Sequence, residues 1–100
     1  MNDRGQAAVS DNQADSRFEV LVTDRRAELV YRSGDDRLVL IHTEVPPELE
    51  GHGIGGQLVA AAVDRAAREG LTVVPLCPFA RGWLQRHPDT AARVTIDWSA

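Results

Sequence analysis

Four glycines fall between residues 51 and 56, and the adjacent prolines Pro46 and Pro47 stand just before them. We expect a loop here, because proline donates no ladder hydrogen bond and glycine lets the backbone turn sharply. The segments on either side are regular: β-branched and apolar residues predominate in 37–45, and apolar residues recur at helical spacing over 57–69. Any fold for this chain must therefore contain a strand, a glycine-rich turn and a helix in that order.

The residues before the two prolines predict three strands in succession. Apolar residues recur at every second position over 18–22 and 27–32, and β-branched residues continue over 37–45. The sequence Ser-Gly-Asp-Asp at 33–36 is a strong hairpin signal, because Gly and Asp tolerate the positive φ of tight turns. We therefore expect an antiparallel meander.

Beyond the first helix, the pattern predicts a buried strand and a second helix. Residues 71–77 are apolar almost throughout, which is typical of a strand covered on both faces. Pro78 suits the first position of a helix, in which Phe79 and Trp83 at helical spacing are expected to pack in the core. Residues 92–98 form either a last strand or an ordered tail. On the first helix, the residues expected to face water are Asp64, Arg65, Arg68 and Glu69.

The element order is thus β-β-β-α-β-α, which predicts an α+β fold with a mixed, mainly antiparallel twisted sheet and two packed helices. Residues 1–16 are polar and have no apolar face to bury, so we expect a disordered tail there. The remaining residues, 17–100, are enough for one domain with a single core.

Composition excludes several classes of function. Fifteen acidic residues against eleven basic ones give a net charge of −4, which argues against a nucleic-acid-binding surface. The basic residues are all arginines, so chemistry that depends on lysine is excluded. With one cysteine, Cys77, no internal disulfide can form, and no apolar run reaches the ~20 residues of a membrane span. We expect a cytoplasmic protein, monomeric or a small homo-oligomer, without metal, membrane or nucleic-acid partners.

The glycine-rich turn before a helix predicts an anion site. Backbone N–H groups at a helix N-terminus point outward, and the positive end of the helix dipole lies there, which together suit a phosphate or pyrophosphate. The turn is not a Walker loop, because that loop requires a lysine. It is not part of a dinucleotide-binding fold either, because an antiparallel meander precedes it. A glycine-rich turn that serves only the fold remains the alternative.

The residues of this turn also resemble a known family. The pattern Glu50-x-x-Gly53-x-Gly55 resembles the pyrophosphate loop of the GNAT (GCN5-related) acetyltransferase superfamily, which reads Gln/Arg-x-x-Gly-x-Gly/Ala. The longer strings HTEVPPELEGHGIGGQLV and GLTVVPLCPFARGWLQRHPD are similar to the very small YjdJ-type GNAT subfamily. The resemblance covers about half of the chain, from His42 to Asp89. One position departs from the pattern, since Glu50 stands where Gln or Arg is usual.

The resemblance implies an N-acetyltransferase that takes acetyl-CoA as co-substrate and an amine as acceptor. The pyrophosphate would lie on backbone N–H groups of residues 52–56, and the pantetheine beside residues 43–45, where the strand splays from the 71–77 strand. The thioester carbonyl would accept a hydrogen bond from a backbone N–H near Val45. The cofactor-binding residues expected on this basis are Thr43, Val45, His52, Gly53, Ile54, Gly55, Gly56, Pro78 and Arg81.

Three side chains are candidates for catalysis. Cys77 lies at the end of its strand, directly before Pro78, where a helix dipole favours the thiolate, and the subfamily carries a cysteine in this motif. It is expected to act as an acyl acceptor or as an acid/base group, the alternative being a buried apolar residue. His42 and Glu44 lie two residues apart and so share one strand face, where Glu44 can accept the proton of an amine and His42 can assist.

Two further readings stay open beside acetyl transfer within a ternary complex. One is a non-catalytic CoA-binding or regulatory module, which Glu50 and the absence of any tyrosine after Gly56 favour, because many GNAT enzymes use a late tyrosine as general acid. The other is a purely structural α+β domain. The acceptor amine is not identified by the sequence.

Overall fold

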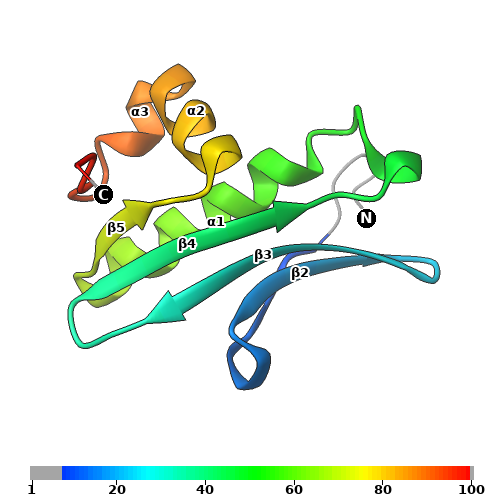
Figure 1. The fold of residues 1–100 in the computed structure, drawn as a ribbon, viewed down its shortest axis with the longest axis horizontal. Coiled ribbons are helices and arrows are strands. Elements are labelled where there is room, and N and C mark those ends of the chain that lie inside the picture. Colours follow the sequence, from blue (N-terminus) through cyan, green and yellow to red (C-terminus); the bar gives the residue numbers. More distant parts are fainter. Residues whose placement is uncertain (1–7, 100) are drawn as a thin grey trace.

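The computed structural model describes residues 8–99 (Figure 1). Its five-stranded sheet follows chain order, β1-β2-β3-β4-β5, with antiparallel pairing up to β4 and a parallel β4–β5 pair. The strands are β1 (Ser10–Asn12), β2 (Arg17–Val22), β3 (Arg25–Ser33), β4 (Arg37–Glu44) and β5 (Thr72–Pro75). The helices are α1 (Ile54–Glu69), α2 (Pro78–Arg86) and α3 (Pro88–Ala91), with short 3₁₀ turns at Gln13–Asp15 and Pro47–Leu49. The predicted α+β fold with a mainly antiparallel sheet is confirmed. Two details differ: α1 begins at Ile54 and so includes two glycines that were predicted in the loop, and a short third helix follows the two that were predicted.

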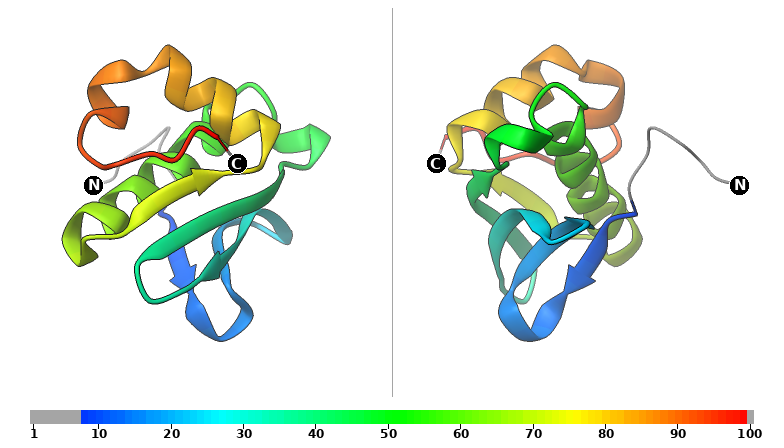
Figure 2. Two further views of the ribbon diagram at one scale, coloured as in Figure 1. Left: turned by 60° about the vertical axis from the view of Figure 1, so that its left-hand side comes forward. Right: turned by 90° about the vertical axis from the view of Figure 1, so that its right-hand side faces the viewer.

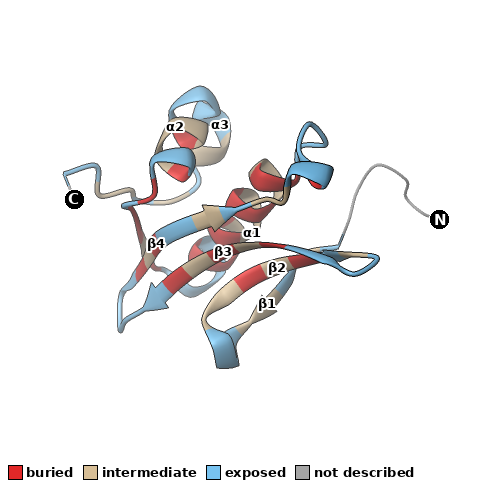
Figure 3. Ribbon diagram, turned by 45° about the vertical axis from the view of Figure 1, so that its right-hand side comes forward, coloured by how far each residue is buried: buried red, intermediate tan, exposed pale blue. Residues whose placement is uncertain are grey.

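One face of the sheet is covered by α1, and α2 packs against α1 and the β4–β5 pair (Figure 2). Alternate residues of β2, β3 and β4 are buried, as the period of two requires where one face of the sheet is covered (Figure 3). Their partners on α1 recur at helical spacing. The largest fully buried side chains include Val20, Leu29, Leu38, Leu40, Leu58, Val59, Val63 and Leu84. Burial of each such side chain stabilises the fold by about 1.5–3 kcal/mol.

The C-terminal segment runs beside β5. Val73 donates its N–H to the carbonyl of Thr95 at 2.9 Å and accepts from the N–H of Asp97 at 2.9 Å, and Val73 and Ile96 form an isolated parallel bridge. Of the two expectations for residues 92–98, the structure has an ordered segment with one bridge.

The N-terminal part of the chain differs from the sequence-based prediction. Residues 1–7 of the predicted disordered tail lie outside the described residues. Residues 10–12, by contrast, form β1 and pair with β2, so the prediction is wrong for this segment. The sequence has few apolar residues there, but backbone hydrogen bonds and polar side chains hold the strand.

Besides its pairing with β2, β1 contacts the domain through a buried polar network around Arg65. Arg65 was expected to face water, yet it is 7% exposed. Its guanidinium donates to the hydroxyl of Tyr31 (2.9 Å), to Asp11 of β1 (3.1 Å) and to Ser33 (3.3 Å). Tyr31 in turn donates to Asp11 at 2.6 Å. The expectation failed because helical spacing alone does not reveal a polar partner on a distant strand.

No helix within residues 8–99 is both long enough and apolar enough to cross a lipid bilayer.

Candidate active site

A β-bulge in β4 decides which side chains face each side of the strand. Tyr31 pairs with Leu40 and Val30 pairs with His42, so Ile41 is one residue too many on β4. Because side chains alternate, an extra residue exchanges the two faces beyond it. Thr43, which pairs with the buried Leu29, therefore points toward the α1 side.

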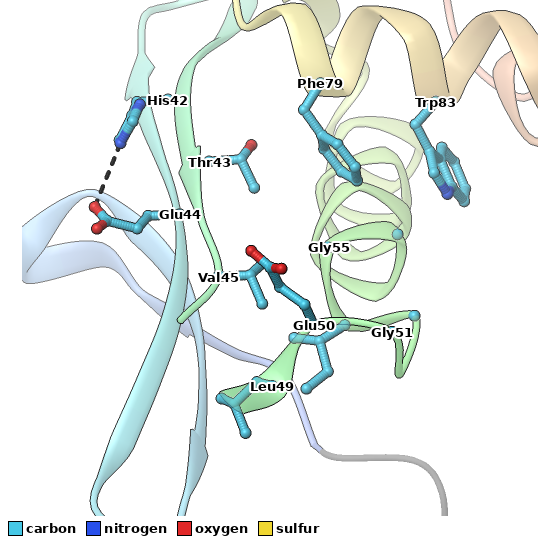
Figure 4. A pocket seen from close by; sticks show the side chains of 13 residues that line it. His42, Thr43, Glu44, Val45, Leu49, Glu50, Gly51, Gly55, Phe79 and Trp83 are labelled. Atoms are coloured by element: carbon cyan, nitrogen blue, oxygen red, sulfur yellow. Dashed lines mark ion pairs between the residues drawn. The ribbon is translucent and has the colours of Figure 1, made fainter. Parts of the chain in front are cut away.

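The same bulge sends His42 and Glu44 to the opposite side of the strand. Figure 4 shows their side chains pointing away from those of Thr43 and Val45. His42 Nε2 lies 3.5 Å from Glu44 Oε1, and both side chains are largely exposed. As expected from their spacing, the two residues share one face.

Beyond the bulge, β4 and β5 diverge as expected. Their pairing ends at Leu40 and Pro75, and the Leu40 carbonyl accepts from the N–H groups of Leu76 and Cys77, both at 3.0 Å. The chain then turns into α2 at Pro78, while β4 continues to Glu44 without a strand on that side. This divergence opens a cleft between the end of β4 and the start of α2.

The N-terminus of α1 closes one end of this cleft. Gly51 and Gly53 have φ of 85° and 75°, the left-handed region that glycine adopts without strain. The N-cap is Gly53, which has no side chain to accept from the first turn. The first N–H groups of a helix have no acceptor within it, so those of residues 54–56 are open to a ligand.

Gly55 and Gly56 are required by helix packing rather than by φ. A Cβ on Gly55 would lie 2.7 Å from the ring of Phe79, and a Cβ on Gly56 would overlap the indole Nε1 of Trp83. The two aromatic residues were expected in the core, but they lie in the cleft wall, and Phe79 is 41% exposed. Their spacing of four, matched to two small residues on α1, is the sequence signal for this contact.

The cleft has a volume of about 740 Å³, within the range usual for small-molecule sites. It is lined by the end of β4, the glycine-rich turn and the aromatic residues of α2. The lining residues are His42, Thr43, Glu44, Val45, Leu49, Glu50, Gly51, Gly53, Ile54, Gly55, Gly56, Phe79 and Trp83.

Glu50 brings a negative charge into this cleft. Figure 4 shows its carboxylate between Val45 and Gly55, pointing into the open space. No arginine belongs to the described wall of the cleft. Any anion bound here therefore depends on backbone N–H groups and has a carboxylate as a neighbour.

The other predicted site residues lie outside the cleft wall. Cys77 is the N-cap of α2 and is 3% exposed, and its Sγ lies 3.1 Å from the hydroxyl of Thr43, which lines the cleft. His52 and Pro78 are exposed but do not line the cleft. Arg81 hydrogen-bonds the carbonyl of Trp98 and lies over its ring.

The site is a cleft between two diverging strands, and an uncapped helix N-terminus lies at one end of it. Proteins of this class can hold an extended ligand with an anionic group. Residues 17–94 match the model of the GCN5-related N-acetyl-transferase family, and the chain belongs to this family. It is thus a GNAT-type N-acetyltransferase, a transferase of acyl groups.

The fold has a solved counterpart. The NMR solution structure of a GCN5-like candidate N-acetyltransferase from Staphylococcus aureus superposes with a TM-score of 0.68, at 24% sequence identity over 93% of each chain. At this identity the likeness concerns the fold. Within residues 8–99, no group of three or more His, Cys, Asp and Glu side chains is arranged to hold a metal ion.

Proposed function

We propose that the protein transfers the acetyl group of acetyl-CoA to an amine. One observation carries this proposal: the diverging ends of β4 and β5 and the uncapped N-terminus of α1 open into the same cleft. An extended thioester with a diphosphate needs both parts, a slot beside a free strand edge and a set of unpaired N–H donors.

The residues present fit such a ligand. The N–H groups of Ile54, Gly55 and Gly56 would hold the diphosphate, because they lack acceptors within the helix. The pantetheine would run along the inner side of β4 past Thr43 and Val45. A backbone N–H at this end of β4 would donate to the thioester carbonyl and stabilise the negative charge that develops there.

The reaction is a displacement at the thioester carbon. The amine nitrogen forms a bond to the acetyl carbon, and the bond between that carbon and the CoA sulfur breaks. The sulfur leaves as a thiolate, and the nitrogen loses a proton. In the overall reaction the thiolate gains one proton and becomes the thiol. The products are an N-acetylated amine and the CoA thiol.

Glu44 is the proposed base for the amine proton. It lies at the rim of the cleft on the outer side of β4, and His42 is 3.5 Å away. General-base catalysis contributes about 10²–10⁴ in rate, and the exposure of Glu44 places it at the lower end. Glu44→Gln is therefore expected to lower kcat about 10²-fold with little change in the affinity for acetyl-CoA.

The position of Cys77 favours direct transfer over a covalent acetyl-cysteine route. The thiol is buried and hydrogen-bonds the hydroxyl of Thr43, so an acetyl group on it would need the close-packed neighbours to move. Cys77→Ser, which keeps a hydrogen-bonding partner for Thr43, should retain turnover within about threefold. Loss of turnover in this variant would support the acetyl-cysteine route instead.

The experiment that tests the proposal follows binding and turnover separately. In a Trp98→Phe variant, Trp83 in the cleft wall is the remaining indole, and acetyl-CoA should change its fluorescence. S-acetylpantetheine, which lacks the diphosphate, should bind at least tenfold more weakly. Release of the CoA thiol is then measured with a panel of amines. No binding at millimolar acetyl-CoA would overturn the proposal, and binding without amine-dependent release would leave a CoA-binding module.

A further inference from the structure

A second groove adjoins the cleft on the outer side of β4. It has a volume of about 480 Å³ and lies between the β2–β3 turn and the end of β4. Its wall includes Asp24, Arg25, Arg26, Glu28 and Glu44. Glu44 lines both the groove and the cleft, so it is the point where a molecule in the groove reaches the proposed thioester.

We propose that this groove holds the acceptor and that the acceptor is a small aliphatic diamine; this rests on the acetyl transfer proposed above. One nitrogen lies at Glu44 and receives the acetyl group. The second nitrogen stays protonated and lies toward Asp24 at the other end of the groove.

The guanidinium groups of the groove are already matched by carboxylates. Arg25 Nη2 lies 3.0 Å from Glu48 Oε2, and Arg26 Nε lies 3.5 Å from Glu28 Oε1. They therefore offer little to an anionic ligand. This pairing argues against the opposite assignment, in which the two arginines bind a carboxylate or phosphate of the acceptor.

The negative charge that remains lies at the two ends of the groove. Glu44 lies opposite Glu28 across the β3–β4 pair. Glu28 is already near Arg26 (3.5 Å) and Arg17 (3.8 Å), so the carboxylate left for a cation at this end is that of Glu44. At the other end, Asp24 Oδ1 lies 4.0 Å from Arg25 Nε, the limit of an ion pair, and Arg25 lies closer to Glu48, at 3.0 Å. Two carboxylates at opposite ends match two amino groups on one short chain.

Amine chemistry agrees with this arrangement. An aliphatic amine has a pKa near that of lysine, about 10.4, and is cationic at neutral pH. The nitrogen that attacks must lose a proton, and a neighbouring carboxylate can first attract the ammonium and then take that proton. A second ammonium keeps the molecule attracted to the groove after the first nitrogen is neutral.

Three acceptors of equal chain length test the inference. They are 1,4-diaminobutane, butylamine and 4-aminobutanoate, whose far ends are cationic, neutral and anionic; diamines of three and five carbons are measured beside them. The expected order of kcat/KM is diamine, then monoamine, then amino acid. Equal rates for the best diamine and its monoamine, with transfer intact, would overturn the inference and leave the proposed function standing.

Variants locate the second nitrogen. Asp24→Asn should reduce the preference for the diamine over butylamine by about two- to fivefold, the effect of one exposed ion pair. Asp35→Asn, in the β3–β4 hairpin away from the groove, is the control and should leave the preference unchanged. An unchanged preference in Asp24→Asn would contradict the assignment of the groove.

Calorimetry of 1,4-diaminobutane with the CoA-saturated protein gives a readout that does not need turnover. Diamine binding that Asp24→Asn weakens, without acetyl transfer to any amine, would support the groove and overturn the proposed function. Absence of diamine binding would overturn the inference.

Discussion

At the scale of single residues, the charge of Glu50 is the feature of the cleft that opposes its proposed ligand. Its carboxylate points into the cleft near the first turn of α1, whose N–H groups are the expected donors to a diphosphate. Like charges at an exposed site repel each other weakly, because water and salt screen them. Glu50 should therefore lower the affinity for acetyl-CoA without abolishing it.

Glu50→Gln is expected to bind acetyl-CoA about two- to fivefold more tightly than the natural chain, with the difference shrinking at high salt. Isothermal titration at two salt concentrations measures this. Glu48→Gln is the matched control, because Glu48 pairs with Arg25 outside the cleft. Equal affinities for Glu50→Gln and the natural chain would mean that the carboxylate turns away when the ligand binds.

Tyr31 gives a second prediction at this scale. Burial, together with the hydrogen bond to Asp11 and its negative charge, raises the pKa of Tyr31 from 10.0 to about 12, against the opposing effect of Arg65. Because the fold favours the neutral phenol, this contribution to stability is complete below pH 10 and is lost as the pH rises through 12. Tyr31 is the only tyrosine, so the ultraviolet absorbance of tyrosinate should rise with a midpoint near pH 12. A midpoint near pH 10 would show that the network around Tyr31 is open.

Sequence patterns located the backbone part of the site better than its side chains. Gly53 and the diverging strand ends follow from local rules, since turns and apolar runs depend on neighbours in the chain. The contacts of Cys77 with Thr43 and of Arg65 with Tyr31 join segments that are distant in the sequence. A single sequence carries no signal for those.

At the scale of elements, the packing of α2 on α1 forms one wall of the cleft. Gly55 and Gly56 allow the rings of Phe79 and Trp83 to lie directly on the first turn of α1. The small residues thus serve the ligand site twice, by leaving N–H groups accessible and by bringing the aromatic wall close to them.

Gly56→Ala should destabilise the fold by about 1 kcal/mol. Overlap with Trp83 costs about 1–3 kcal/mol, and the better helix propensity of alanine returns part of it. Urea denaturation measures the change, and Gly34→Ala is the control because nothing lies within 4 Å of its added Cβ. In a Trp83→Leu background the loss should largely disappear, and a loss that persists there would show that helix packing is not its cause.

The elements themselves were predictable and the bulge was not. Residues 37–44 all suit a strand, so the sequence does not indicate which of them is the additional residue of the bulge. The bulge becomes visible only when β4 is aligned with β3, where Val30 and Tyr31 skip Ile41. The assignment of His42 and Glu44 to the outer side depends on that register.

At the scale of the whole molecule, the Arg65 network joins the first strand to the middle of the chain. Asp11, Tyr31 and Arg65 come from β1, β3 and α1, and their side chains meet at the inner side of the sheet. A buried guanidinium whose partners are well placed adds little on balance, but removal of one member leaves the others unpaired.

Arg65→Ala is therefore expected to lower the free energy of unfolding by about 3 kcal/mol. Arg68→Ala, an exposed position on the same helix, should change it by less than about 0.5 kcal/mol. Hydrogen exchange provides a second measurement, since amides of residues 10–12 should lose protection in Arg65→Ala before the core does. Equal stability of the two variants would mean that β1 is held by its backbone pairing alone.

The surplus residue in β4 gives that strand an unusual mutational profile. Exchange of Ile41 for valine should be tolerated, because the side chain is 37% exposed. Its deletion should leave the two faces of β4 as they are, because Val30 would still pair with His42 and Leu29 with Thr43 once the extra residue is gone. Both mutants should therefore keep turnover, which assays of the two side by side measure, and a folded but inactive deletion mutant would contradict this register. β4 can thus lose this one residue without turning its side chains over, a tolerance that the regularly paired β2 does not have.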